Sequence, residues 1–299
     1  MITVNGYEPT FSVFPNGELN VALSKSLLEY SERTLEANIE WHFNSNEEVV
    51  KLALLISALE PIVDSINVYC GYLPYSRMDR REENKHNPFS LEAFINLLPA
   101  TTLGTDITYT YEDVHNLDVA NQLFDRRKGD NIRFHYQLTG VSSVFHAKVI
   151  LADFEKVLIV LPDKGSKKRY NSLISDGKMP MLSNSDADIA VGYKNRDFDT
   201  HKITDFGITN LVDNKPLTKE YVTSFDKIAI IDDVVSYGNT FINLLDYLGN
   251  LGAKDVDLIV GNVEDALWRG DLLSNKYLGH VYTSGNLTNH TSDSNVIIY

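Results

Sequence analysis

Apolar residues along this chain gather in short runs that alternate with stretches of helical spacing. Residues 49–59 and 89–98 show the helical spacing, and each stretch leads into a run typical of a strand, beginning near residues 66 and 106. In the second half, similar runs recur near residues 157, 187, 227, 255 and 279. Strands that alternate with helices are typical of parallel sheets, so the pattern predicts two α/β units.

The length of the chain agrees with two units of this kind. With 299 residues, of which 43% are hydrophobic, the chain can bury two cores of ordinary domain size. We expect a hinge near residues 137–143, which gives an N-terminal domain at 1–142 and a C-terminal domain at 143–285. The remaining stretch, 286–299, is a polar tail in which a loop precedes a last short strand at 296–299.

The apolar run at residues 227–231 ends in two adjacent carboxylates, Asp232 and Asp233, and a helical pattern starts at residue 241. The loop between them holds Ser236, Tyr237, Gly238, Asn239 and Thr240. Ligands bind at the carboxyl ends of such strands, where loop N–H groups and the next helix favour a phosphate. Carboxylates beside a phosphate site suit the hydroxyls of a ribose phosphate. Ordinary strand-to-helix turns use the same residue types, so the residues alone leave both interpretations open.

A basic loop follows the strand expected near residue 66. Arg77, Arg80 and Arg81 surround Asp79, and their planar groups present several donors to phosphate oxygens. Basic loops are usually solvated surface, but a local arginine cluster is less expected in a chain of net charge -14.

The 232–240 loop resembles the ribose-phosphate loop shared by type I phosphoribosyltransferases and phosphoribosyl-pyrophosphate (PRPP) synthetases. In that family, two Asp bind the ribose 2- and 3-hydroxyls, and a Thr/Gly loop holds the 5-phosphate. Asp232, Asp233 and Thr240 match by position, whereas residues 236–239 depart from the usual pattern. The resemblance assigns the whole loop to ribose-phosphate binding.

Four further segments resemble the PRPP synthetases and not the transferases, which are half as long. Residues 14–18 are similar to the element that contacts the adenine of ATP from a neighbouring subunit, with Asn16 in place of an Asp. The loop at 75–81, with its helix start at 87–88, looks like the ATP loop. His115 looks like a magnesium ligand. The resemblance thereby implies an ATP site of Phe14, Asn16, Glu18, Arg77, Asp79, Arg80 and His115.

The remaining matches fall in the second half of the chain. Asp163 looks like the second magnesium-site residue, and Arg169, six residues on, also matches the family. Lys194 and Arg196 keep the two catalytic positions of the mobile loop, and Asn195 replaces the residue between them.

The resemblance implies two type I phosphoribosyltransferase-like, Rossmann-like α/β domains with parallel sheets and pseudo-twofold symmetry. It also implies an ATP-dependent diphosphokinase that uses Mg²⁺. Such an enzyme moves the β,γ-pyrophosphoryl group of ATP to the anomeric hydroxyl of a ribose 5-phosphate moiety and releases AMP. Relatives of this type are homo-oligomers, either dimers or hexamers, that share the ATP site between subunits.

The acceptor follows less directly from these residues. Ribose 5-phosphate is the family default, but some members of this superfamily, chiefly in phages, act on ADP-ribose. Tyr237, with Asn239 beside it, could stack against a base and make room for such a nucleotide. Simple divergence of the loop with an unchanged substrate explains the residues equally well.

Two other functions remain open. A non-catalytic regulatory paralogue should have lost catalytic cations or metal ligands, whereas Lys194, Arg196, His115 and Asp163 are all present. A plain phosphoribosyltransferase would explain only the 232–240 loop.

Composition limits the partners and the compartment. A net charge of -14 argues against nucleic acid as a partner. The single cysteine, Cys70, lies in an apolar run, which predicts a buried thiol. Because no stretch reads as a signal peptide or a membrane span, we expect a soluble cytoplasmic protein without a membrane partner.

Overall fold

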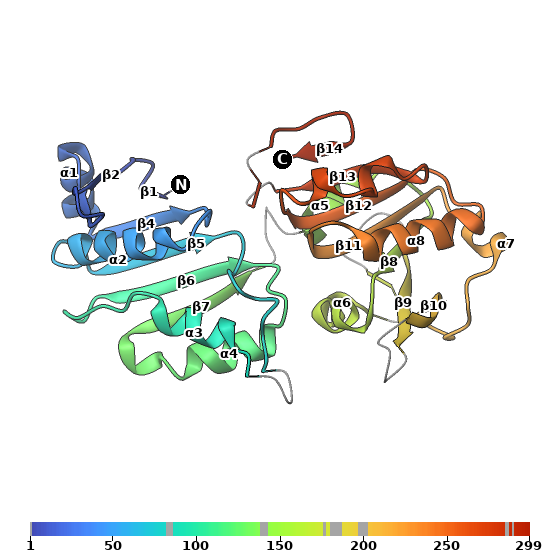
Figure 1. The fold of residues 1–299 in the computed structure, drawn as a ribbon, viewed down its shortest axis with the longest axis horizontal. Coiled ribbons are helices and arrows are strands. Elements are labelled where there is room, and N and C mark those ends of the chain that lie inside the picture. Colours follow the sequence, from blue (N-terminus) through green and yellow to red (C-terminus); the bar gives the residue numbers. More distant parts are fainter. Residues whose placement is uncertain are drawn as a thin grey trace. The chain divides into compact units, whose positions relative to one another are not determined.

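The computed structural model describes residues 2–81, 86–137, 143–175, 178–179, 187–196, 203–284, 287–288 and 290–299. The chain divides into two compact units, an N-terminal unit at Met1–Gln137 and a C-terminal unit at Leu138–Tyr299 (Figure 1). Each unit contains a sheet in which most neighbouring strands are parallel, with helices between the strands. The α/β fold class predicted from the sequence is confirmed.

The N-terminal unit has a five-stranded sheet in the order β1-β4-β5-β6-β7. Only β1 at the edge is antiparallel to its neighbour. The strands are β1 Ile2–Val4, β4 Glu36–Trp41, β5 Ser65–Cys70, β6 Asp106–Glu112 and β7 Ile132–Gln137. The helices are α1 Lys25–Thr34, α2 Glu47–Leu59, α3 Ser90–Leu97 and α4 Leu117–Asp125. A separate hairpin, β2 Thr10–Val13 with β3 Leu19–Ala22, packs against α2.

The C-terminal unit has a seven-stranded sheet in the order β10-β9-β8-β11-β12-β13-β14, in which only β9 and β10 are antiparallel. The strands are β8 Val157–Leu161, β9 Asp188–Arg196, β10 Ile203–Asn210, β11 Lys227–Val235, β12 Val256–Val263, β13 Leu278–Thr283 and β14 Val296–Ile298. The helices are α5 Ser143–Ile150, α6 Lys164–Arg169, α7 Lys219–Val222 and α8 Asn239–Asn250.

The centre of the larger sheet is covered on both faces, which explains its continuous apolar runs. On one face Ile230 joins a cluster with residues of α8, and on the other Ile231 joins a cluster with Ala147 of α5. Strands buried on both faces carry few polar residues. Carboxylates appear toward the carboxyl ends of these strands, with Asp163 just after β8 and with Asp232 and Asp233 among the last four residues of β11.

Six strands were not predicted from the sequence: β1, β2, β3, β4, β7 and β10. In β4 every second residue faces solvent, so its apolar content is low, and β7 is a mixed run of the same kind. The strand expected at 296–299 is β14, which pairs in parallel with β13 and so belongs to the main sheet. Within the described residues, no helix is long and apolar enough to cross a membrane.

Candidate active site

The two adjacent carboxylates lie near the carboxyl end of β11 and share one buried cation. Nη1 of Arg169 donates to Oδ1 of Asp232 at 2.6 Å and forms an ion pair with Oδ1 of Asp233 at 2.8 Å. The side chains of Arg169 and Asp233 are 3% and 2% exposed, whereas that of Asp232 is 17% exposed. Asp232 is therefore the acid of the pair that a ligand reaches more easily.

Burial is the main influence on the charge of this acid pair. Burial and the neighbouring charge of Asp233 raise the pKa of Asp232 from 3.8 to about 7, against the opposing effect of Arg169. Burial lowers the pKa of Arg169, but the charges of Asp233, Tyr170 and Asp232 raise it well above its usual value, so the guanidinium stays charged. The pair can therefore gain or lose a proton near neutral pH.

The loop after β11 makes a tight turn that leads directly into α8. Gly238 has φ +86°, and a Cβ there would meet the Leu272 side chain at 2.6–2.7 Å, so a glycine is required. The first residue of α8, Asn239, follows directly, and the O of Gly238 accepts from the N of Ile242 at 3.0 Å. The start of a 12-residue helix thus lies next to the loop, where backbone N–H groups favour an anion.

Tyr237 in this loop is half exposed and has a cationic neighbour. Its side chain is 51% exposed, and the guanidinium carbon of Arg269 lies 6.0 Å from the centre of its ring. The backbone of Gly270 packs against the carbonyl of Tyr237, where a Cβ would come within 2.4 Å of the oxygen. The turn after β12 is therefore built closely against the loop after β11.

Asp163 lies at the neighbouring strand end, since β8 pairs with β11 in parallel. It is the N-cap of α6, and its Oδ1 accepts from the backbone N of Gly165 at 2.8 Å and of Ser166 at 3.1 Å. Arg169 is the last residue of the same helix. One short helix therefore connects the expected metal ligand to the cation that holds the acid pair.

In the N-terminal unit, the loops after β5 and β6 are joined by a hydrogen bond. Nδ2 of Asn116 donates to Oδ2 of Asp79 at 2.6 Å, and Asn116 also caps α4. His115 directly precedes this residue, so it lies at the same edge of the sheet as the Arg77 loop. Arg77 and Arg80 are exposed on this loop. The structure thus brings together the Arg77, Asp79, Arg80 and His115 segments expected to bind ATP.

The expected adenine element is the turn of the β2–β3 hairpin. Gly17 has φ +89°, and Oδ1 of Asn16 accepts from the N of Glu18 at 3.2 Å, which fixes the turn. Phe14 is exposed, and the N of Phe14 donates to the O of Glu18 at 2.8 Å. Asn16 thus has a local role in shaping the turn. The described hydrogen bonds of this turn are internal to it and connect it to none of the arginines.

Lys194 and Arg196 lie at the carboxyl end of β9, opposite Phe206 and Ile203 of β10. Their side chains lie outside the described part of the chain, so the expected catalytic role stays a prediction. No group of three or more metal-ligating side chains occurs within the described residues. A magnesium ion would therefore depend on one or two protein ligands together with substrate phosphates, which is its usual coordination in nucleotide enzymes.

Sequence reasoning left the role of Arg169 unassigned and did not find Arg269. Arg169 follows Asp163 by six residues, but its contact with the acid pair spans 63 residues of chain. Arg269 comes from a short turn after β12, and nothing in its own segment relates it to residue 237.

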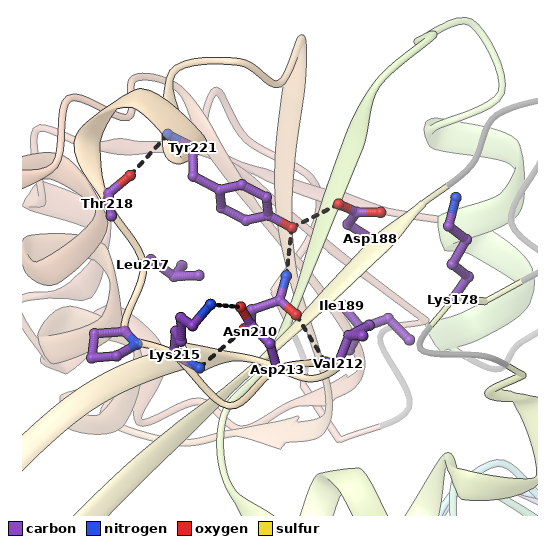
Figure 2. A pocket seen from close by; sticks show the side chains of 11 residues that line it. Lys178, Asp188, Ile189, Asn210, Val212, Asp213, Lys215, Leu217, Thr218 and Tyr221 are labelled. Atoms are coloured by element: carbon purple, nitrogen blue, oxygen red, sulfur yellow. Dashed lines mark hydrogen bonds and ion pairs between the residues drawn. The ribbon is translucent and has the colours of Figure 1, made fainter.

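One cavity of the C-terminal unit lies away from the acid pair. It has a volume of about 440 Å³ and is lined by the start of β9, the end of β10 and the segment leading into α7 (Figure 2). The hydroxyl of Tyr221 donates to Asp188 at 2.6 Å and accepts from Asn210 at 2.7 Å. Asp188 begins its strand, whereas Asp232 lies near the end of its own, so the two places lie at opposite edges of the sheet.

No family model matches the chain, but curated proteins and a solved structure are similar to it. A ribose-phosphate pyrophosphokinase from Mycoplasmopsis pulmonis (strain UAB CTIP) is 24% identical over 252 residues, which cover 84% of this chain and 68% of that protein. One from Pyrococcus abyssi (strain GE5 / Orsay) is 25% identical over 247 residues, 82% of this chain and 73% of that protein. The crystal structure of phosphoribosylpyrophosphate synthetase from Mycobacterium smegmatis has a TM-score of 0.63 at 18% identity, covering 98% of this chain and 85% of that one.

Proposed function

Because this chain belongs to the ribose-phosphate pyrophosphokinase family, we propose that it is an ATP-dependent diphosphokinase. It transfers the β,γ-pyrophosphoryl group of ATP to the anomeric hydroxyl of a ribose 5-phosphate moiety and releases AMP. The observation that carries this proposal is the Asp232–Asp233 pair, held by Arg169 beside a glycine loop and the start of α8.

The acceptor is bound at this place by two kinds of interaction. Carboxylate oxygens of Asp232 and Asp233 accept hydrogen bonds from the ribose 2- and 3-hydroxyls. The hydroxyl and amide donors of Ser236, Asn239 and Thr240, with the backbone N–H groups at the start of α8, hold the 5-phosphate.

The nucleotide is bound by Arg77, Asp79, Arg80 and His115 of the N-terminal unit. The guanidinium groups contact phosphate oxygens, because planar multi-donor groups fit them well. His115 and Asp163 are the residues that would hold magnesium, and the bound ion would neutralise phosphate charge. Phe14, Asn16 and Glu18 contact the base from a second subunit, which agrees with their exposed position on the hairpin.

The transfer needs no covalent intermediate. The anomeric oxygen forms a bond to the β-phosphorus as the bond from that phosphorus to the α,β-bridging oxygen breaks. AMP leaves with the bridging oxygen, and the proton of the hydroxyl passes to solvent. Lys194 and Arg196 stabilise the charge that grows on the phosphoryl oxygens in the transition state.

Two acceptors fit this chemistry, ribose 5-phosphate and ADP-ribose. The half-exposed ring of Tyr237, with the Arg269 guanidinium 6.0 Å from its centre, supports the larger one. A nucleotide attached to the 5-phosphate could stack on this ring and place its second phosphate near the cation. Ribose 5-phosphate, in contrast, needs neither residue.

The test is to incubate the protein with Mg²⁺ and ATP, adding ribose 5-phosphate or ADP-ribose separately, and to follow AMP release. We expect release that depends on one of the two acceptors. ATP without acceptor, and acceptor without Mg²⁺, are the controls. A protein that binds ATP but releases no AMP with either acceptor would instead be a regulatory subunit.

The shared ATP site makes a separate prediction about assembly. If Phe14 and Glu18 complete a neighbour's site, the active species is a dimer or a hexamer. Light scattering on the active fraction measures this, and mixing a Phe14→Ala variant with an Arg77→Ala variant should restore activity through mixed sites. A fully active monomer would show that the hairpin does not act between subunits.

A further inference from the structure

Arg169 is a buried cation that contacts two acids with a single nitrogen. Its Nη1 lies 2.6 Å from Oδ1 of Asp232 and 2.8 Å from Oδ1 of Asp233, and its guanidinium also lies 5.6 Å from the centre of the Tyr170 ring. The backbone N of Asp233 donates to the same Asp232 oxygen at 3.0 Å. The spacing between the two carboxylates is therefore fixed by one group that holds both.

Stability alone gives no reason for this arrangement. Removing charges from water is unfavourable, and a buried ion pair often stabilises a protein no better than apolar side chains of similar size. Such a cluster is retained where the position of its charges matters for binding or catalysis.

We propose that Arg169 is a positioning residue, which holds Asp232 and Asp233 at the spacing required by the two neighbouring hydroxyls of the acceptor ribose. The proposal rests on the proposed function, because it concerns the acceptor. Both ion pairs use Oδ1, so one guanidinium nitrogen sets how far apart the two carboxylates lie. The same charge favours the ionised acids, which accept hydrogen bonds from hydroxyls better than neutral ones do.

The chain contains a matched cluster at the other end of the same strand. Lys227 begins β11, its side chain is 9% exposed, and its Nζ lies 2.8 Å from Asp255 and 2.9 Å from Asp257. This cluster also joins one cation to two acids, but it lies at the edge opposite the acceptor loop. Loss of a buried cation can thus be measured with and without an effect on the acceptor.

The experiment compares Arg169→Gln, Arg169→Lys and Lys227→Gln with the unchanged protein. Calorimetric titration measures the affinity for ribose 5-phosphate, for ADP-ribose and for Mg²⁺·ATP, and steady-state kinetics separate KM from kcat. For Arg169→Gln we expect acceptor affinity to fall about 10- to 100-fold, since hydrogen bonds to charged groups are lost, while ATP affinity stays within about threefold. Arg169→Lys should recover part of the acceptor affinity because it keeps the charge.

The pH profile separates positioning from simple stabilisation. The acid limb of acceptor binding should move to higher pH in Arg169→Gln, since the acids lose their cation, and should move less in Arg169→Lys. Lys227→Gln should lower the melting temperature and leave both acceptor affinity and the acid limb unchanged. Equal losses for ATP and acceptor, or the same changes in Lys227→Gln, would overturn the proposal.

Failure of the proposed function has a different outcome. If the unchanged protein binds neither acceptor, the proposed reaction is wrong, and carbon-detected NMR titration of the Asp232 carboxyl still tests Arg169. Arg169→Gln must then shift that titration to higher pH while Lys227→Gln does not. A titration that is unchanged in Arg169→Gln would show that the guanidinium does not control the acid pair.

Discussion

The two units each place their proposed ligand-binding residues near strand ends, but the two proposed sites are built differently. In the C-terminal unit, Arg169 and Asp233 are almost fully buried and are fixed by ion pairs of 2.6 and 2.8 Å. In the N-terminal unit, Arg77 and Arg80 are exposed, and the hydrogen bond between Asp79 and Asn116 joins two loops near the surface. The proposed acceptor site in the C-terminal unit is therefore fixed before a ligand binds. The proposed nucleotide site in the N-terminal unit consists largely of side chains that face solvent.

The difference between the two sites corresponds to the chemical groups of the two proposed ligands. A ribose presents neutral hydroxyls whose recognition depends on geometry, and rigid acceptors lower the entropic cost of binding it. ATP with Mg²⁺ brings strong charges, and exposed arginines can adjust to its phosphates. We infer that the proposed acceptor site is ordered before its ligand binds, whereas the proposed nucleotide site gains its order from its ligand.

The largest expected effect tests whether the two proposed sites only bind their ligands, while residues at the end of β9 determine the rate of the chemical step. Replacing Lys194 with Ala should reduce turnover by about 10³-fold, because positioned cations stabilise transition-state charge by several kcal/mol. ATP and acceptor affinity should change little. Single-turnover kinetics with titration of both ligands measures this. A variant with near-normal turnover would remove the proposed mechanism and favour a regulatory role.

The next largest effect concerns the buried acid pair of the proposed acceptor site. Asp233→Asn keeps the shape of the side chain but removes the charge that Arg169 contacts, and should weaken either acceptor by about 10- to 100-fold. ATP affinity should stay near normal, because Asp233 lies outside the nucleotide place. Asp257→Asn, in the cluster around Lys227, is the control for loss of a buried carboxylate. A comparable loss of ATP affinity would show that the two places are not independent.

A further variant tests the proposed nucleotide site, and it should weaken ATP binding without affecting acceptor binding. His115→Ala should weaken Mg²⁺-dependent ATP binding by about tenfold, as expected for loss of one ligand or its support at a metal site. Acceptor binding should be unaffected. Titrating ATP at several Mg²⁺ concentrations measures it, since a lost metal ligand is partly overcome by more metal. A loss that added Mg²⁺ does not reduce would assign His115 a purely structural role.

Features of the two sites could be predicted from the sequence where they depend on neighbouring residues, and could not where they depend on contacts between distant segments. The run at residues 157–161 and the run ending in Asp232 were recognisable because strands buried on both faces are apolar throughout. The strand at Glu36–Trp41 was missed because alternate positions face water and dilute its apolar signal. The segments expected to bind ATP were found by local resemblance, and the joining of two of them by Asp79 and Asn116 appeared only in the fold.

Burial was the part that local sequence could not supply. Resemblance matched Arg169 to the family by position, but nothing in its segment predicts that packing of α6 against β8 and β9 buries it against acids 63 residues away. Tyr237 and Arg269 are likewise related by the parallel pairing of β11 with β12. Contacts between distant segments depend on the register of the sheet, which residue spacing alone does not determine.

The acid pair also predicts that folding stability and acceptor affinity depend on pH, a dependence that we do not expect from the proposed nucleotide site. The folded pKa of Asp232 is raised from 3.8 to about 7, so its contribution to stability is fully present below pH 3.8 and is lost as pH rises through 7. Acceptor affinity should change in the opposite sense and fall about tenfold for each pH unit below 7, because the ionised acid binds the hydroxyls.

Chemical unfolding between pH 4 and 8 and acceptor titration over the same range measure the two signs. If ADP-ribose binds, it is the better probe, since a phosphate monoester itself titrates near pH 6. Asp232→Asn should lose both dependences, and an unchanged profile in that variant would assign the titration to another group.

The smallest expected effect tests whether the proposed acceptor site recognises groups beyond the ribose phosphate. Tyr237→Ala should weaken ADP-ribose more than ribose 5-phosphate by about 1 kcal/mol, or about fivefold, if a base stacks on the exposed ring. Tyr237→Phe keeps the ring and should restore the difference, whereas Arg269→Gln should reduce it by removing the cation near the second phosphate. Competition titrations with both acceptors measure the ratio directly. Because Asp232 and Asp233 serve the sugar in either case, equal losses for the two acceptors in Tyr237→Ala would limit recognition to the ribose phosphate, and ribose 5-phosphate would then be the substrate.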